Sequence, residues 1–283
     1  MNERTELESL GEFGLIERLT PEHTRQIKNS STILSIGDDA ACLEYKDKVV
    51  LVSTDIMTEG VHFDMVYTPL KHLGYKACVV NFSDIYAMNA RPKQITISLA
   101  VSNRYSVEAL EELYAGIYLA CEKYGVDVVG GDTTSSAAGM FLSITVIGEA
   151  EKEKVVKRNG AKPYDLLCVT GDLGGAYAGL LVLQREKAAF MVNPNSQPQL
   201  KDYEYEVGRQ LKPEAKKKII DFFEQEGILP TSMIDISDGL ASEALHICTQ
   251  SEVGCEIYLE KLPIDYRASK TFEEFKILAD TGA

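Results

Sequence analysis

The sequence lacks the patterns that mark several common classes of protein. None of its six cysteines lies in a C-x-x-C pair, and most fall inside apolar runs, which is typical of buried reduced thiols rather than of a disulfide framework or a zinc site. No stretch approaches the roughly 18 consecutive apolar residues of a membrane-spanning helix. The N-terminus, Met-Asn-Glu-Arg-Thr-Glu, is too polar for a signal peptide. These absences predict a cytoplasmic protein that has no membrane partner.

Positive charge is also scarce. The chain has 29 Lys and Arg against 43 Asp and Glu, a formal net charge of -14. Nucleic-acid binding draws its affinity from clustered Lys and Arg, so the balance argues against a nucleic-acid partner. An acidic chain can still bind nucleotides when divalent cations stand between its carboxylates and the phosphates. The familiar nucleotide motifs are missing, since neither a G-x-x-x-x-G-K-[ST] loop nor a G-x-G-x-x-G after a strand occurs.

The first half of the chain has the pattern of an α/β domain. Between about Val49 and Ile147, short β-branched runs alternate with longer stretches of helical period. Ser106 is a candidate N-cap, and Gly125 is where its helix should end. The pattern predicts strands over 48–54, 95–101, 126–129 and 142–146, and helices over 70–88 and 107–124.

The second half starts after a charged connection, residues 149–157, and we place the domain boundary near residue 150. The domains are thus 1–150 and 151–283. A strand over 166–170, the glycine-rich segment 171–175 and a small-residue helix predict a second α/β domain. Residues 186–215 have the composition of a loop-rich insertion. The sequence ends without a closing strand or helix, which predicts that the second domain is cut short.

Aspartates lie where apolar elements end. Because ligands collect at the carboxyl ends of strands in open α/β sheets, such residues can reach one site from distant parts of the chain. The alternative for each of them is an ordinary turn or cap aspartate. The aspartates in these places are Asp38, Asp39, Asp55, Asp132, Asp235 and Asp238.

Asp84 is harder to explain as a cap. It follows Leu73, Ala77 and Val80 at steps of four and three, which places a carboxylate on the apolar stripe of a predicted helix. A metal ion or a buried salt bridge would supply the partner that such a carboxylate needs. Ligands that are all oxygen, without His-x-x-x-His or cysteine spacing, suit magnesium or manganese.

Several neighbouring residues fit the same chemistry. Hydroxyls at Ser53, Thr54, Thr133, Thr134 and Ser237 offer neutral ligands, and the glycines of 130–131 allow phosphate to approach the backbone. Arg158 would bring positive charge to a triphosphate, or belong to a solvated charged run. His62 would contact a substrate, or be a core histidine with a satisfied hydrogen bond. The segment 171–175 would bind phosphate, or let a helix pack tightly on its strand.

Taken together, the motifs follow a family order over most of the chain. The motifs are Gly11–Ile16, Gly37–Ala40, Ser53–Asp55, Glu59–Phe63, Asn81–Met88, Gly130–Thr134, Arg158–Pro163 and Asp235–Leu240. In these motifs the sequence resembles the thiamine-monophosphate kinases. They are a family of the ATP-binding superfamily that also includes aminoimidazole ribonucleotide synthetase, selenophosphate synthetase and a hydrogenase maturation protein.

The resemblance implies a two-domain, synthetase-like α/β (α+β) fold. It also implies a homodimer that pairs through its N-terminal sheets, with the nucleotide in a cleft that the partner completes. The implied reaction converts ATP and thiamine monophosphate into ADP and thiamine diphosphate by direct Mg²⁺-assisted transfer, without a covalent nucleophile. The implied metal ligands, for several magnesium ions, are Asp39, Ser53, Thr54, Asp55, Asp84, Asp132, Asp235 and Asp238. The implied ATP contacts are Gly131, Asp132, Arg158 and Ser237, and the implied substrate contact is His62.

The sequence leaves three alternatives open: another synthetase of the superfamily, a non-catalytic nucleotide-binding protein, and an acidic globular protein without a site. Another ATP-using synthetase of the superfamily, above all an aminoimidazole ribonucleotide synthetase, would share the architecture. A selenophosphate synthetase would carry a reactive cysteine before the first aspartate motif, and residues 1–37 contain none. A non-catalytic Mg-nucleotide-binding protein would bind ATP without forming ADP. The family's later motif Gly-Gly-Glu-Asp-Tyr-Glu-Leu does not occur here, so the resemblance covers the metal and nucleotide parts better than the substrate part.

Overall fold

The first half of the protein is built on one mixed sheet. The computed structural model describes residues 30–34, 38–46 and 48–277. The sheet has the strand order β1-β2-β3-β6-β4-β5, and among its neighbouring strands β4 and β5 are parallel while the others are antiparallel. Its strands are β1 (Thr32–Leu34), β2 (Ala41–Tyr45), β3 (Lys48–Thr58), β4 (Arg91–Val101), β5 (Asp127–Ser135) and β6 (Met140–Glu151).

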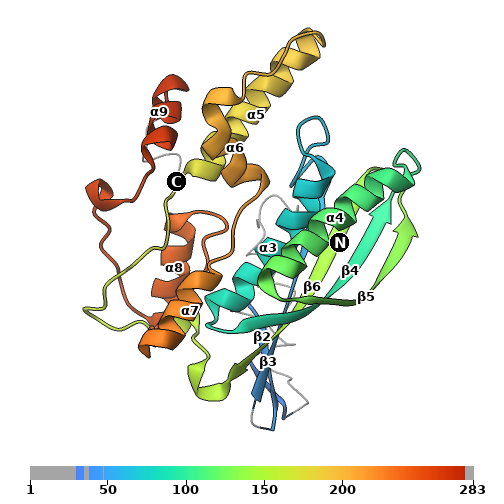
Figure 1. The fold of residues 1–283 in the computed structure, drawn as a ribbon. Coiled ribbons are helices and arrows are strands. Elements are labelled where there is room, and N and C mark those ends of the chain that lie inside the picture. The colour runs from blue at the N-terminus through green and yellow to red at the C-terminus, as the bar shows by residue number, and fades with distance from the viewer. Residues whose placement is uncertain (1–29, 35–37, 47, 278–283) are drawn as a thin grey trace, which may run out of the picture.

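Two helices, α3 (Leu70–Ala87) and α4 (Val107–Tyr124), cover one face of this sheet (Figure 1). The inward residues of β6, such as Leu142 and Val146, are buried, as their period-two spacing predicts. The predicted caps of α4 are confirmed, since Ser106 Oγ accepts from the Ala109 amide at 3.3 Å and Gly125 adopts φ 71°. At Gly74, an added Cβ would lie 2.0 Å from the Leu113 carbonyl oxygen, so glycine lets the two helices approach closely.

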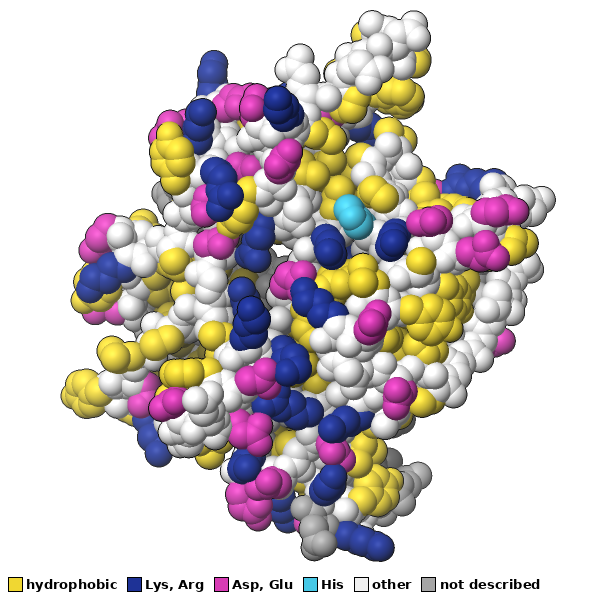
Figure 2. Space-filling view, in the orientation of Figure 1, with side chains coloured by type: hydrophobic (Ala, Val, Ile, Leu, Met, Phe, Trp, Pro, Cys, Tyr) yellow, Lys and Arg dark blue, Asp and Glu magenta, His cyan; other side chains and the backbone are white. Residues whose placement is uncertain are grey.

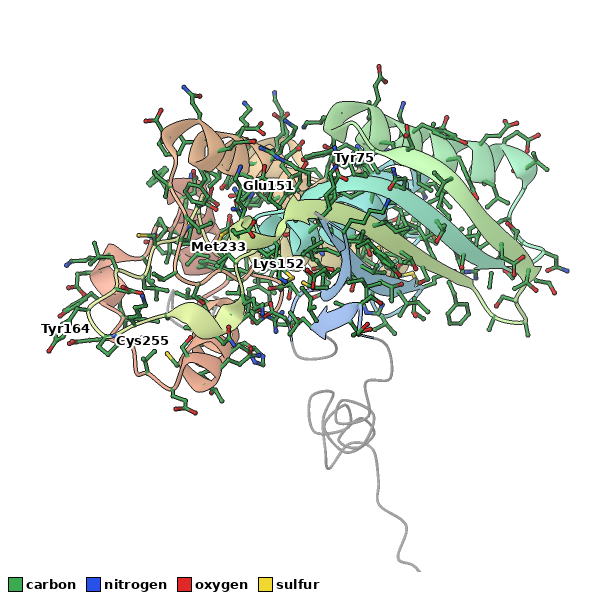
Figure 3. All side chains as sticks on the ribbon, turned by 90° about the horizontal axis from the view of Figure 1, so that it is seen from below. Tyr75, Glu151, Lys152, Tyr164, Met233 and Cys255 are labelled. Carbon is green, nitrogen blue, oxygen red and sulfur yellow. The ribbon has the colours of Figure 1, made fainter. Side chains whose placement is uncertain are left out.

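The opposite face of the sheet is open in the part of the chain that the structure describes. Figure 3 shows α4 on one side of strands β4 to β6 and no described helix on the other. The register places Ile56, Ser143 and Ser98 in one row across this open face, and Ile56 is 56% exposed. The open face therefore exposes an isoleucine beside the two serine hydroxyls of this row.

The strands are longer than the sequence patterns predict. The prediction that Asp55 and Asp132 follow the ends of strands was wrong, because both lie inside strands, β3 and β5. The reason is pairing: β3 pairs with β6 from Lys48 to Thr58, and β5 pairs with β4 as far as Ser135. Ladder hydrogen bonds extend a strand through polar and glycine residues whose own preference for strands is low.

Helices make up the second half. The α-helices are α5 (Gly175–Val192), α6 (Glu204–Leu211), α7 (Lys217–Glu226), α8 (Leu240–Ser251) and α9 (Tyr266–Glu274), and the 3-10 turns are η2 (Lys152–Lys154), η3 (Arg158–Gly160), η4 (Lys201–Tyr203) and η5 (Leu259–Lys261). Ala178, Ala268 and Phe272 form a small second core. No helix among the described residues has the length and apolar composition needed to cross a membrane.

Two predictions for the second half were wrong. Residues 166–170 form no strand, and Leu166 is 88% exposed, because no strand within 152–277 pairs with this segment. The cysteines were expected to be buried, and Cys42, Cys78 and Cys121 are. Cys168 and Cys255, in the second half, are exposed. The loop prediction for 186–215 holds only between the helices, since α5 runs to Val192 and α6 begins at Glu204.

Helix α7 joins the two halves. Ile220 is buried in the core formed by the sheet, α3 and α4. Arg91 on β4 forms ion pairs with Asp221 and with Glu224, the latter at 2.7 Å. On the face in Figure 2, Lys and Arg side chains gather in a band between the sheet half and the second-half helices. The last strand of the sheet ends at Glu151, close to the predicted domain boundary at residue 150. Because α7, from the second half, packs on the core of the first half, the division into two domains stays a prediction.

Candidate active site

Three predicted ligands converge on one point. The structure brings carboxylate oxygens of Asp39, Asp84 and Asp235 within 4.8 Å of one another. Asp39 precedes β2, Asp84 lies in the last turn of α3, and Asp235 lies in the segment before α8. Segments far apart in the sequence thus meet where the end of α3 reaches the second half.

Ser53 and Asp55 face this cluster from β3. Ser53 Oγ donates to Asp84 Oδ2 at 2.6 Å, and the Asp55 amide donates to Asn81 Oδ1 at 3.2 Å. Burial, followed by the charges of Asp235 and Asp55, raises the pKa of Asp84 to about 9. Asp84 therefore holds its proton near neutral pH unless a cation replaces it.

Arg158 is the cation beside the cluster. Its Nη2 and Nε donate to Asp39 at 2.6 and 3.1 Å, and its backbone amide donates to Asp38 Oδ2 at 3.2 Å. The hydroxyls of Ser232 and Ser251 donate to the Arg158 carbonyl at 2.7 and 2.9 Å, which fixes the backbone of η3. The predicted ATP contact thus pairs with a predicted metal ligand.

The donor set fits a hard divalent cation. Burial and the charge of Asp39 raise the pKa of Asp235, as burial does for Asp38. Among the described residues, only the Arg158 guanidinium pairs with these carboxylates, and the excess negative charge disfavours their full ionisation. Oxygen donors with hydroxyl neighbours are the ligands that Mg²⁺ takes, so the residues present fit magnesium.

Thr54 and Asp132 lie away from this cluster. Neighbouring residues of a strand point to opposite faces, and Thr54 bonds across the open face, accepting from Thr145 Oγ1 at 3.0 Å. Asp132 is level with Ser98 on β4 and lines a hollow of about 180 Å³ on the open face. Gly131 is required by the neighbouring strand, because an added Cβ would lie 2.1 Å from the Ile97 carbonyl oxygen.

Ser237 and Asp238 follow Asp235 in the loop before α8. Both are exposed, and their backbone amides donate to Glu243 Oε1 at 3.2 and 2.9 Å. The sequence interpretation missed Glu243, as it missed the Ser83 side chain, which hydrogen-bonds Asp235. Glu243 lies three residues after Leu240 and four before Ile247, on an apolar stripe, which is the signal that identified Asp84.

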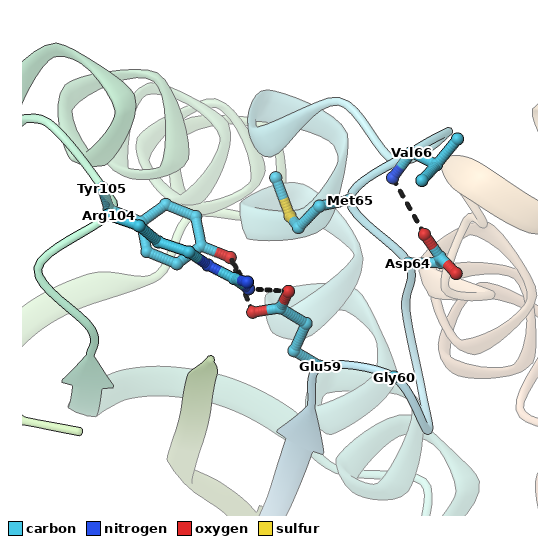
Figure 4. A pocket seen from close by; sticks show the side chains of 7 residues that line it. All are labelled: Glu59, Gly60, Asp64, Met65, Val66, Arg104 and Tyr105. Carbon is cyan, nitrogen blue, oxygen red and sulfur yellow. Dashed lines mark hydrogen bonds and ion pairs between the residues drawn. The ribbon is translucent and has the colours of Figure 1, made fainter. Parts of the chain in front are cut away.

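His62 lies in a turn at the end of β3. It is exposed, and its Nδ1 accepts from the Thr58 amide at 2.9 Å. The same turn borders a cavity of about 430 Å³ (Figure 4). In this cavity the Tyr105 hydroxyl donates to Glu59 Oε2 at 2.7 Å, and Arg104 pairs with the other oxygen of Glu59. Met65 and Val66 add apolar surface to this polar lining.

Comparisons with known proteins show the family of this chain. The family model described as AIR synthase related protein, N-terminal domain, matches residues 37–150. Thiamine-monophosphate kinase of Bacillus subtilis (strain 168) is 36% identical over 271 residues, which cover 94% of this chain and 79% of that protein. Thiamine-monophosphate kinase of Aquifex aeolicus (strain VF5) is 36% identical over 270 residues, which cover 95% of this chain and 80% of that protein. This chain belongs to the thiamine-monophosphate kinase family.

A solved structure of this family confirms the fold. AaThiL complexed with AMPPCP and TMP matches with a TM-score of 0.83 and 33% identity, covering 99% of this chain and 83% of that one. The expected synthetase-like α/β fold and the family resemblance are therefore both confirmed. The motif Gly11–Ile16 lies outside the described residues. Among the described motifs, it is Asn81–Met88 and Asp235–Leu240 that supply Asp84 and Asp235 to the cluster.

Proposed function

We propose that this chain transfers the γ-phosphoryl group of ATP to the phosphate of thiamine monophosphate, giving ADP and thiamine diphosphate. The observation that carries the proposal is the convergence of Asp39, Asp84 and Asp235 in a member of the thiamine-monophosphate kinase family. A complex of AaThiL with AMPPCP, an analogue of ATP, and TMP supports both substrates.

Magnesium is the proposed metal, held by Asp39, Ser53, Asp55, Asp84 and Asp235. When bound, it would neutralise phosphate charge and align the two reacting phosphates. Ser53 orients Asp84 by donating to one of its oxygens. The proposed acceptor, a phosphate oxygen, is already ionised near neutral pH, so no strong general base is needed.

Arg158 is the proposed ATP contact, together with Gly131, Asp132 and Ser237. Arg158 donates two hydrogen bonds to the Asp39 carboxylate. A phosphate group can accept the same pair of N–H donors, so the guanidinium could bind a phosphate of ATP in place of Asp39. We propose that Arg158 turns from Asp39 to the nucleotide when Asp39 serves as a ligand.

The remaining proposed residues lie outside the three-aspartate cluster. Thr54 and Asp132 lie on the open face, so we propose that they act where a second protomer closes the site. Asp238 is proposed as an outer ligand, since it follows Asp235 in the same loop. His62 is proposed as a substrate contact, because its turn borders the cavity of about 430 Å³ that suits the organic part of the substrate.

A homodimer that pairs through the open sheet face is the proposed assembly. Replacing Ile56 by glutamate is expected to shift the protein toward monomer, because the charge would be buried between the two sheets. Analytical ultracentrifugation at several concentrations measures this. Tyr118→Glu, a matched change at a 56% exposed aromatic residue on α4, is the control and should leave the association constant unchanged. An unchanged association constant for Ile56→Glu would exclude the open face as the interface.

The reaction itself is tested by incubating the protein with Mg-ATP and thiamine monophosphate and separating the products, with ATP alone as the control. Formation of thiamine diphosphate in step with ADP is the expected result. ADP without thiamine diphosphate would point to a different acceptor, and bound nucleotide without ADP would point to a non-catalytic protein. The free cysteines support a reducing compartment, so we propose that the reaction takes place in the cytoplasm.

A further inference from the structure

Glu243 is a buried carboxylate that the proposed reaction does not use directly. It lies in the first turn of α8 and is 4% exposed. Among the described residues, no Lys, Arg or His nitrogen lies within 4 Å of its carboxylate. A buried carboxylate without a cation is costly unless hydrogen-bond donors compensate its charge.

The donors come from the loop that carries Asp235. Glu243 Oε1 accepts from the amides of Ser237 and Asp238 at 3.2 and 2.9 Å, and the Ser237 hydroxyl lies at 3.5 Å. The N-cap residue Gly239 has no side chain to cap α8, and Glu243, in the first turn, instead accepts from the amides of the two residues that precede the N-cap. Two backbone amides of the loop thus share one acceptor oxygen on α8, which ties the loop to the helix.

The same loop is held from its other side. Asp235 receives a hydrogen bond from Ser83 on α3, one residue before Asp84. The loop is therefore fixed between α3, through Ser83, and α8, through Glu243. Without Glu243, two backbone amides would lose their acceptor and the loop would be free to move away from Asp39 and Asp84.

We propose that Glu243 is a positioning residue, which holds residues 235–238 in the conformation that brings Asp235 into the acidic cluster. The inference rests on the proposed function only in taking this cluster as the magnesium site. Glu243 itself acts through backbone amides and not as a ligand of the metal.

The test compares Glu243→Ala and Glu243→Gln with wild type, and uses Glu206→Gln as the matched control. Glu206 is also a buried glutamate, 1% exposed, but its carboxylate contacts Thr271 in the second core. Two measurements need no turnover: the dissociation constant for Mg²⁺ by calorimetry, and hydrogen exchange of the amides of 235–239.

For Glu243→Ala, the dissociation constant for Mg²⁺ is expected to rise roughly 10–100-fold, as for other residues that orient metal ligands. Exchange of the Ser237 and Asp238 amides should become faster. Glu243→Gln keeps one acceptor oxygen and should lie between wild type and alanine in both measurements, with kcat affected more than the KM for thiamine monophosphate. Glu206→Gln keeps an acceptor for Thr271 and should leave both Mg²⁺ binding and amide exchange of 235–239 unchanged.

Wild-type Mg²⁺ binding and wild-type amide exchange in Glu243→Ala would overturn the proposal. If that variant does not fold, the same two results in Glu243→Gln would overturn it, since a weaker acceptor must loosen the loop. A protein that makes no thiamine diphosphate, but loses Mg²⁺ affinity in Glu243→Ala, would refute the proposed function and leave the positioning role standing.

Discussion

Replacing Asp84 by asparagine is expected to lower kcat about 100-fold or more without weakening the fold. Asparagine keeps the size of the side chain and can still accept from Ser53 Oγ, so the packing at the end of α3 is preserved. What it loses is the negative charge that would attract magnesium, and metal-assisted phosphoryl transfer depends on that charge. In the metal-free protein at about pH 8, the variant should be at least as stable as wild type, because a carboxyl disfavoured by burial has been replaced by a neutral group.

Two measurements separate the effect on catalysis from an effect on folding. Steady-state kinetics at saturating Mg-ATP gives kcat, and thermal unfolding in EDTA gives the stability of the metal-free protein. Asp202→Asn, at an exposed aspartate of η4, is the control for the chemical change and should retain wild-type values in both. Wild-type turnover by Asp84→Asn would remove Asp84 from the metal site.

Asp84 also shows how much of the candidate site can be predicted from the sequence. Its place on an apolar helical stripe was visible without a structure, because Asp84 follows Leu73, Ala77 and Val80 at steps of four and three. Glu243 carries the same signal on α8. By contrast, the hydrogen bond between Arg158 and Asp39 joins residues 119 positions apart. No local sequence pattern predicts a contact over that separation.

The fold, too, has features that local sequence signals predict and others that depend on strand pairing. Helices α3 and α4 could be predicted closely, since their stripes and the caps Ser106 and Gly125 are local signals. The face on which Thr54 and Asp132 lie depends on strand register, which is set by pairing with β6 and β4. Residues 166–170 have the composition of a strand but lack a paired neighbour, and composition alone does not supply one.

The largest expected effect of pH is on magnesium binding. In the unfolded chain Asp84 and Asp235 ionise near the ordinary aspartate pKa of 3.8, whereas in the folded protein the pKa of Asp84 is about 9 and that of Asp235 is raised. Between these values the folded state holds protons that the unfolded chain has lost. The stability that these two groups contribute is complete below the unfolded pKa, and it is lost from the metal-free protein as pH rises through the folded values.

Magnesium must displace the same protons, so its apparent dissociation constant is expected to fall by about tenfold per pH unit for each proton displaced between about pH 6 and pH 8.5. The gain in Tm on adding Mg²⁺ should therefore be several degrees larger at the higher pH, as mass action requires for tighter binding. Thermal unfolding with Mg²⁺ and with EDTA across this range measures both trends. Asp84→Asn removes the group with the higher pKa and should flatten the dependence. A gain in Tm that is equal at all pH values in wild type would show that magnesium does not compete with protons at Asp84 and Asp235.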